Sequence, residues 1–202
     1  MNIDRDDSAW IHPATVFDGQ ASVGFCSRVG HGATPDKPVL IADGVRIGAF
    51  CLIEAGAQLG AGVEVDHYCR IGCGARVGAR TRILYRAQVF DEVTIGRNCI
   101  IGGELVDRTV VGNNVTFQGN TAHTHGDATG DWDETEEASP VIKSGSVVGV
   151  DAILIGGVTV GPRAYVAAGE RVTCNVPREM VLRGGELRPL SEFRGMIKVR
   201  EE

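Results

Sequence analysis

The chain has no long hydrophobic run and no pattern of a secretory leader. None of its uncharged apolar stretches approaches the ~18 residues that a membrane-spanning helix needs. Residues 1–7 are acidic rather than basic, and no apolar core of a signal peptide follows them. We therefore expect a soluble, cytoplasmic protein that is neither secreted nor inserted in a membrane.

An excess of positive charge is also lacking. The net charge of the 202 residues is −6, with both signs interspersed, so nothing suggests a basic surface for nucleic acid. Glycine is abundant, at 28 residues, but no every-third-residue period indicates collagen. A chain of this length can form a single domain with a substantial core.

No C-x-x-C spacing links the six cysteines, so we expect neither a structural zinc site nor a disulfide framework. Cys51, Cys69 and Cys99 belong to a six-residue repeat, at positions that are predicted to be buried. A thiol packs there as a small hydrophobe. Reduced, structural cysteines are the simplest interpretation.

A branched aliphatic residue recurs at every sixth position without a miss, and a smaller residue precedes each one by two positions. Six is a multiple of the strand period of two, whereas steps of six on an α-helix would spread these side chains over all sides. The aliphatic residues are Ile41, Ile47, Ile53, Leu59, Val65, Ile71, Val77, Ile83, Val89, Ile95 and Ile101. The small residues are Val39, Val45, Cys51, Ala57, Val63, Cys69, Ala75, Thr81, Ala87, Val93 and Cys99.

Glycine follows the aliphatic residue in six of these eleven repeats, where a turning chain can use positive φ without steric cost. Each repeat therefore predicts a short strand followed by a corner. A second run with the same period comprises Ile142, Val148, Leu154, Val160, Val166 and Val172. The pattern indicates a solenoid that is interrupted once and then resumes.

This repeat, over roughly residues 23 to 185, resembles that of the hexapeptide-repeat acyltransferases. The resemblance implies an all-β fold, a left-handed parallel β-helix of triangular section with three hexads in each coil. The left-handed sense comes from the resemblance alone, since parallel crossovers are right-handed in about 98% of cases.

The same pattern divides the chain into segments. We expect an N-terminal capping segment over residues 1–22 and the β-helix over 23–176. A protruding loop, 118–140, interrupts the helix, and a C-terminal cap over 177–202 ends it. A short helix around 189–199 would lie in this cap, because apolar residues recur there at helical spacing.

The loop QGNTAHTHGDATGDWDETEEASP, residues 118–140, contains two of the five histidines, one of the two tryptophans and no lysine or arginine. A long insertion in a compact solenoid is typical of a functional loop. In the sugar and antibiotic acetyltransferases of this class, a histidine begins such a loop after a coil similar to Asn-Val-Thr-Phe at 114–117. The resemblance thus implies that His123 is the general base, with His125 as the alternative, because an imidazole can take the acceptor's proton. Asp127 would orient the base, or is one more charge on a solvated loop.

The resemblance also implies binding sites. Asn120, Trp132 and His67 are candidate acceptor-binding residues, although Trp132 could instead pack against a neighbouring subunit and His67 could be an ordinary surface histidine. The stretch 148–177 is similar to the coils that hold the acyl donor, which implies acetyl-CoA. The candidate donor-binding residues are Gly149, Gly156, Gly157, Ala167, Ala168, Arg183 and Gly184. The family usually continues with Gly-Asn-Pro-Ala, whereas this chain has Arg-Gly-Gly-Glu-Leu at 183–187, so an altered or vacant donor pocket stays open.

The function predicted in this way is acyl transfer, most simply from acetyl-CoA, to an amino or hydroxyl group of a small acceptor. The acceptor would be a sugar, a nucleotide sugar or an aminoglycoside-like molecule. We expect a homotrimer with sites between chains, and no metal. One alternative is a γ-class carbonic anhydrase-like zinc enzyme with His67, His123 and His125 as ligands, although its H-x-x-x-x-H spacing is missing. The other is a non-catalytic scaffold, because fold does not fix function.

Overall fold

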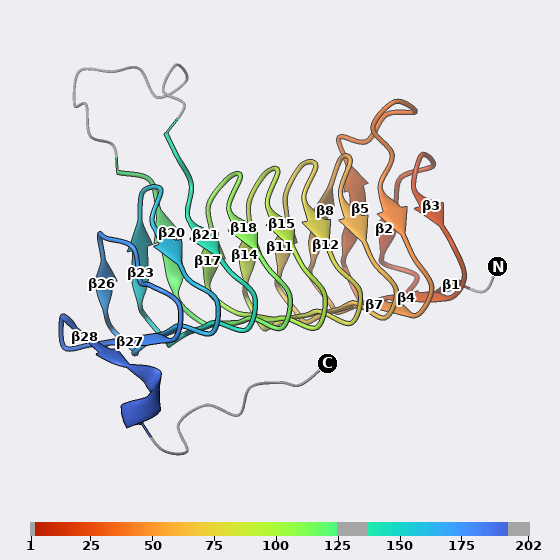
Figure 1. The fold of residues 1–202 in the computed structure, drawn as a ribbon. Coiled ribbons are helices and arrows are strands. Elements are labelled where there is room, and N and C mark those ends of the chain that lie inside the picture. Colours follow the sequence, from red (N-terminus) through yellow and green to blue (C-terminus); the bar gives the residue numbers. More distant parts are fainter. Residues whose placement is uncertain (1–2, 125–136, 194–202) are drawn as a thin grey trace.

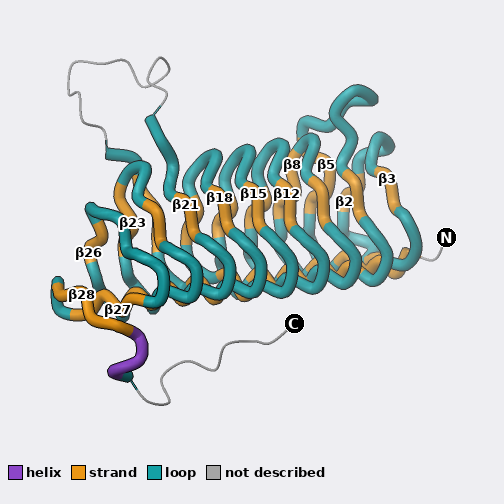
Figure 2. The backbone as a smooth tube through the Cα atoms, viewed as in Figure 1, coloured by secondary structure: helices purple, strands orange, loops and turns teal. Residues whose placement is uncertain are grey.

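The chain forms a parallel β-helix in a computed structural model, which describes residues 3–124 and 137–193. Short strands stack in about nine turns, and the stacked strands form three sheets, called faces A, B and C (Figure 1). Strands alternate with tight corners along every coil (Figure 2). The predicted fold class, an all-β left-handed parallel β-helix, is confirmed.

The chain visits faces A, B and C in turn, and the edges between them are called AB, BC and CA. Face A consists of β1 (Ile3–Arg5), β4 (Ala21–Val23), β7 (Val45–Ile47), β10 (Glu64–Val65), β13 (Arg82–Ile83), β16 (Ile100–Ile101), β19 (Thr116–Phe117), β22 (Val147–Val148), β25 (Tyr165–Val166), β27 (Met180–Arg183) and β28 (Glu186–Pro189). Face B consists of β2 (Trp10–Ile11), β5 (Arg28–His31), β8 (Leu52–Glu54), β11 (Arg70–Ile71), β14 (Gln88–Val89), β17 (Glu104–Leu105), β20 (Asn120–Ala122), β23 (Ile153–Ile155) and β26 (Arg171–Val172). Face C consists of β3 (Val16–Phe17), β6 (Leu40–Ile41), β9 (Gln58–Leu59), β12 (Arg76–Val77), β15 (Thr94–Ile95), β18 (Val110–Val111), β21 (Val141–Ile142) and β24 (Thr159–Val160).

The core lies inside the prism and is built from the two predicted sets of side chains. Every aliphatic residue of the six-residue repeat is buried, from Ile41 to Ile101 and again from Ile142 to Val172. The small residues are buried as well, and the three cysteines among them are free thiols. Each fully buried aliphatic side chain stabilises the fold by about 1.5–3 kcal/mol relative to an exposed one.

Two AB corners are shorter than the others, which the sequence pattern did not predict. Most have four residues, whereas Gly102 and Gly103 alone join β16 to β17, and Gln118 and Gly119 alone join β19 to β20. Glycine is required here, because a Cβ on Gly103 would lie 1.9 Å from the carbonyl oxygen of Gly119. The period is therefore broken by two residues in each of these coils, just before the loop.

The two ends of the helix are built differently. β1, β2 and β3 supply the terminal strand of each face, so the segment predicted as an N-terminal cap contributes a coil. At the other end, β27 and β28 form an antiparallel hairpin that the sequence pattern did not predict. The turn of this hairpin is Gly184–Gly185, and both glycines have positive φ, as tight hairpin turns demand.

Helix is almost absent from the described residues. The predicted C-terminal helix is a single 3₁₀ turn, Leu190–Glu192, and residues 194–202 lie outside the described part. Among the described residues, no helix has the length and apolar character to span a membrane.

Candidate functional site

The loop leaves and rejoins the helix at the BC edge, and its two stems are joined by hydrogen bonds. On the outgoing stem, the hydroxyl of Thr124 donates to the carboxylate of Glu137 on the returning stem, 3.0 Å away. The hydroxyl of Ser139 donates to the carbonyl oxygen of Asp107, 2.6 Å away, at the BC corner of the preceding coil. Both stems are therefore fixed to the helix and to each other.

The next coil provides a glycine surface under these stems. Gly156 donates its N–H to the carbonyl oxygen of Ala122, 2.8 Å away. A Cβ on Gly156 would lie 2.6 Å from Cγ2 of Thr124, and a Cβ on Gly157 would lie 2.7 Å from Cβ of Ala138. Both distances are too short for real Cβ contacts, so the stems approach this coil closely only because both residues are glycine.

His123 follows β20 directly and begins the outgoing stem. Its side chain is half-buried at the BC edge, one residue before the Thr124 hydrogen bond. Of the three residues predicted to be catalytic, it is the one within the described part. His125 and Asp127 lie outside the described residues, and so does Trp132.

Asn120 begins β20, and its half-buried side chain is on the outer side of face B, since Thr121 points inward. In the sheet register, Asn120 pairs with Ile153, and Ile153 pairs with Arg171. The outer surface of β20, β23 and β26 therefore presents an amide, an exposed apolar side chain and an exposed guanidinium in a row. Sequence analysis did not select Ile153 or Arg171. Both could have been found from their outward positions, which lie one and two coils after Asn120.

The predicted donor-binding residues border this surface on both sides. Gly156 and Gly157 lie at its BC edge, under the loop stems. Gly149 lies at its AB edge, where a Cβ would be 2.6 Å from the backbone nitrogen of Ala168 in the next coil. Ala167 lies at the same corner as Ala168, with its N–H bonded to the carbonyl of Leu182. At this AB edge, Gly149 thus allows the next coil to stack closely.

Arg183 and Gly184 continue the AB edge beyond this surface, at the hairpin turn. The carboxylate of Glu170 accepts the N–H groups of Gly184 and Gly185, the latter at 3.2 Å. The segment that departs from the family's usual sequence is therefore a turn capped by a carboxylate. The N–H of Gly184 is already used within the protein.

His67 lies apart from these residues within one chain. It follows β10 at the AB edge, whereas His123 follows β20 at the BC edge, three coils further on. Three coils correspond to about 14 Å along the axis. The Nδ1 of His67 accepts the N–H of Ala49 at 2.7 Å, so the proton of the neutral ring is on Nε2.

One cluster has the donor atoms of a metal site, but its chemistry does not favour a metal. Glu54, Cys73 and Asp91 each offer a ligand atom within 4.8 Å of the others. The Arg70 guanidinium lies 2.7 Å from Glu54 and 3.4 Å from Asp91, so it pairs with both carboxylates and offsets one of their two charges. Partial burial, together with Asp91 and Glu54, raises the pKa of the Cys73 thiol. Because the two carboxylates already pair with the Arg70 guanidinium, we assign no metal to the cluster.

Comparison with known proteins gives a match to a family model, a curated relative with similar sequence, and solved structures with a similar fold. Residues 44–79 match the family model described as bacterial transferase hexapeptide (six repeats). The bifunctional protein GlmU of a Nostoc species is 31% identical over 193 residues, which cover 90% of this chain and 40% of that protein. The chain therefore spans less than half the length of this curated relative.

Solved structures with the same fold are more distant in sequence. The UDP-N-acetylglucosamine acyltransferase of Francisella novicida superposes with a TM-score of 0.51 and 16% identity, over 88% of this chain and 65% of that chain. A mutant GDP-perosamine N-acetyltransferase of Caulobacter crescentus, solved with CoA and GDP-perosamine, has a TM-score of 0.39 and 19% identity, over 71% of this chain and 55% of that chain. The first likeness shows the fold, and the second is too low to place a ligand on this chain.

Proposed function

Because the chain belongs to the hexapeptide-repeat family of bacterial transferases, we propose that it is an acyltransferase that uses an acyl-CoA, most simply acetyl-CoA. The acceptor is an amino or hydroxyl group of a sugar or nucleotide sugar. The observation that carries this proposal is the position of His123. It stands at the fixed stem of the loop, beside an outer surface of face B that small residues border on both sides.

The reaction needs one proton acceptor and close positioning of two substrates. The acceptor nitrogen or oxygen attacks the thioester carbonyl carbon, and its proton moves to the imidazole of His123. The carbon–sulfur bond then breaks, and the leaving CoA thiolate takes the proton from the His123 imidazolium. Holding both substrates on one surface supplies much of the rate, because the step becomes effectively intramolecular.

The row of outer side chains suggests how the substrates divide this surface. Asn120 begins the strand that His123 follows, so its amide is placed to bond the acceptor. Arg171 lies two strands further on, where an exposed guanidinium can pair with a phosphate group of the donor. Ile153 between them offers an apolar contact to the donor's arm.

Assembly and location form part of the proposal. We expect a homotrimer, in which the described surface of one chain is completed by its neighbour. A cytoplasmic location suits a protein whose six cysteines are all free.

The test measures release of CoA thiol from acetyl-CoA with a panel of amino sugars and UDP-linked sugars as acceptors. His123→Ala is expected to lower kcat by about 10²- to 10⁴-fold while donor binding, measured by calorimetry, is retained. His31→Ala is the matched control, because His31 is exposed on another coil. Unchanged turnover in His123→Ala would remove His123 from the role of base.

Two further outcomes would redirect the proposal as a whole. Lack of CoA binding by a folded protein would favour the scaffold. Stoichiometric zinc in the purified protein, with hydration of CO₂, would favour the carbonic anhydrase-like alternative.

A further inference from the structure

Four exposed aromatic rings form a continuous row along the AB edge, called the aromatic ladder: Phe25, Phe50, Tyr68 and Tyr85. They come from four successive coils and are between 44% and 55% exposed. The two central rings, Phe50 and Tyr68, are stacked with centroids 4.8 Å apart and an interplanar angle of 10°. Each end ring is nearly perpendicular to its neighbour, at 79°.

This arrangement leaves apolar surface available to a ligand. The central rings lie face to face along the helix axis, so an end ring that is perpendicular to them turns its edge toward the stack. The faces of Phe25 and Tyr85 are therefore not used by the aromatic ladder itself, although one face of Tyr85 is covered by the Arg86 guanidinium, 5.7 Å from the ring centroid. These two rings lie three coils apart, about 14 Å.

The backbone at the two central rings is left-handed. Phe50 and Tyr68 have φ of 57° and 61°. Ten other described non-glycine residues between strands have similar positive φ, so this conformation belongs to the corners of the β-helix and does not by itself mark a binding site. Stacking stabilises the rings there, but does not explain why four of them gather on one exposed edge.

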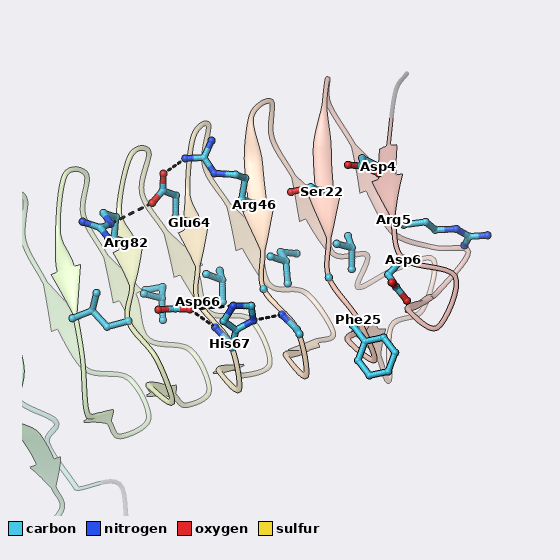
Figure 3. Close-up of a pocket in the computed structure, with 18 of the residues that line it drawn as sticks. Asp4, Arg5, Asp6, Ser22, Phe25, Arg46, Glu64, Asp66, His67 and Arg82 are labelled. Atoms are coloured by element: carbon cyan, nitrogen blue, oxygen red, sulfur yellow. Dashed lines mark hydrogen bonds and ion pairs between the residues drawn. The ribbon is translucent and has the colours of Figure 1, made fainter.

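An open groove of about 880 Å³ runs alongside, over β1, β4, β7, β10 and β13 of face A (Figure 3). Five adjacent strands give it a length of about 19 Å. Phe25 and His67 line it on the side of the aromatic ladder. Its floor carries Arg46, Glu64 and Arg82 in a row, and both guanidiniums contact the carboxylate of Glu64.

The floor is polar, and the lining around it adds Asp4, Asp6, Asp7 and Asp66 against Arg5, so both signs of charge are present. Each guanidinium has five N–H donors and the carboxylate has several lone pairs, so hydrogen-bonding capacity remains after these ion pairs form. This lining favours a ligand rich in hydroxyl groups over an anionic one. The length of the groove favours an extended ligand over a compact one.

We propose that this groove binds an extended oligosaccharide. Sugar rings have an apolar C–H face, which packs on the ring of Phe25 in the groove and, beside the groove, on the face of Tyr85 that Arg86 does not cover. Their hydroxyl groups bond the Arg46–Glu64–Arg82 row. The groove belongs to coils that precede the coil of His123 and to a different edge of the prism. It is a binding site additional to the surface proposed for acyl transfer.

The test is a binding measurement on the full chain without any donor. An array of neutral, amino and acidic oligosaccharides, from tri- to hexasaccharides, is probed first, and the strongest saccharide is then titrated by calorimetry. Phe25→Ala and Tyr85→Ala are each expected to weaken binding by about two- to tenfold, the effect of one aromatic contact. Tyr85→Phe keeps the ring and retains the affinity. Trp10→Ala, which removes an exposed aromatic side chain on face B, is the matched control.

Two results would overturn the proposal. One is an array without a saccharide whose binding depends on Phe25 or Tyr85. The other is a change of molecular mass by light scattering in Tyr85→Ala, which would identify the aromatic ladder as an interface with a second copy of the chain. Because no donor is present, either result is independent of whether the protein transfers acyl groups.

Discussion

Replacing Gly157 by alanine tests whether this glycine supports the loop stem or contacts the acyl donor, as the sequence analysis predicts. The added Cβ would lie 2.7 Å from Cβ of Ala138, whereas carbon atoms in contact prefer about 3.5–4.0 Å. The stem must therefore move by about 1 Å. Gly157 does not have positive φ, so the alanine itself introduces no backbone strain.

The expected effect is on turnover rather than on folding. A displacement of about 1 Å in a positioning element can cost about 10²-fold in rate, which corresponds to about 2.7 kcal/mol in the barrier. The Gly157→Ala variant should therefore show a reduced kcat, with KM for acetyl-CoA and the melting temperature close to those of the parent chain. The release of CoA at a saturating acceptor concentration measures kcat and the KM for acetyl-CoA.

A second substitution makes the test specific. Ala138→Gly removes the atom that the new Cβ would meet, so the double variant Gly157→Ala, Ala138→Gly should recover most of the lost turnover. If Gly157 instead contacts the donor, Gly157→Ala will raise KM for acetyl-CoA, and Ala138→Gly will restore nothing. That result would refute the inference that this coil supports the loop.

Three further changes probe the coils themselves. The buried Thr81 hydroxyl bonds two backbone groups, at 2.8 and 3.1 Å, so Thr81→Val should lower the free energy of unfolding in urea by about 1–3 kcal/mol, against less than about 0.5 kcal/mol for the exposed Thr94→Val. Ile71→Ala should lower it by about 2–5 kcal/mol in the same assay, since Ile71 is fully buried; a smaller loss would mean that the coil collapses around the cavity. Partial burial and then the Asp91 carboxylate raise the pKa of the Cys73 thiol, so Asp91→Asn should lower that pKa and speed alkylation of Cys73 at a fixed alkaline pH. An unchanged alkylation rate, followed by mass spectrometry, would contradict this account of the thiol.

Burial in this protein could be predicted almost entirely from the sequence. A period of six places Ile71 and its equivalents on one side of every strand, and a parallel register of three hexads stacks identical positions over one another. Glu64, for example, pairs with Arg82, which lies eighteen residues, or three hexads, later. Such local regularity needs no knowledge of distant contacts, because every coil repeats the contacts of the previous one.

The candidate site was predicted only in part. His123 could be selected because a histidine at the start of a long loop can be recognised from the sequence alone. The role of Gly157 could not, because its constraint comes from Ala138, which approaches it from the far end of the loop. Arg171 was missed for a similar reason, since its relation to Asn120 depends on the sheet register across the loop.

The sequence by itself thus determined the solenoid, its inward side chains and the place where it is interrupted, because a six-residue period acts within each coil. Only the tertiary structure decided which residues of different coils share an edge or a face. Stacking brings Phe25 and Tyr85, sixty residues apart, onto one edge, and it separates His67 from His123 onto two. These relations depend on the lengths of the corners and loops between strands, such as the two-residue corners before His123, and the period carries no information about them.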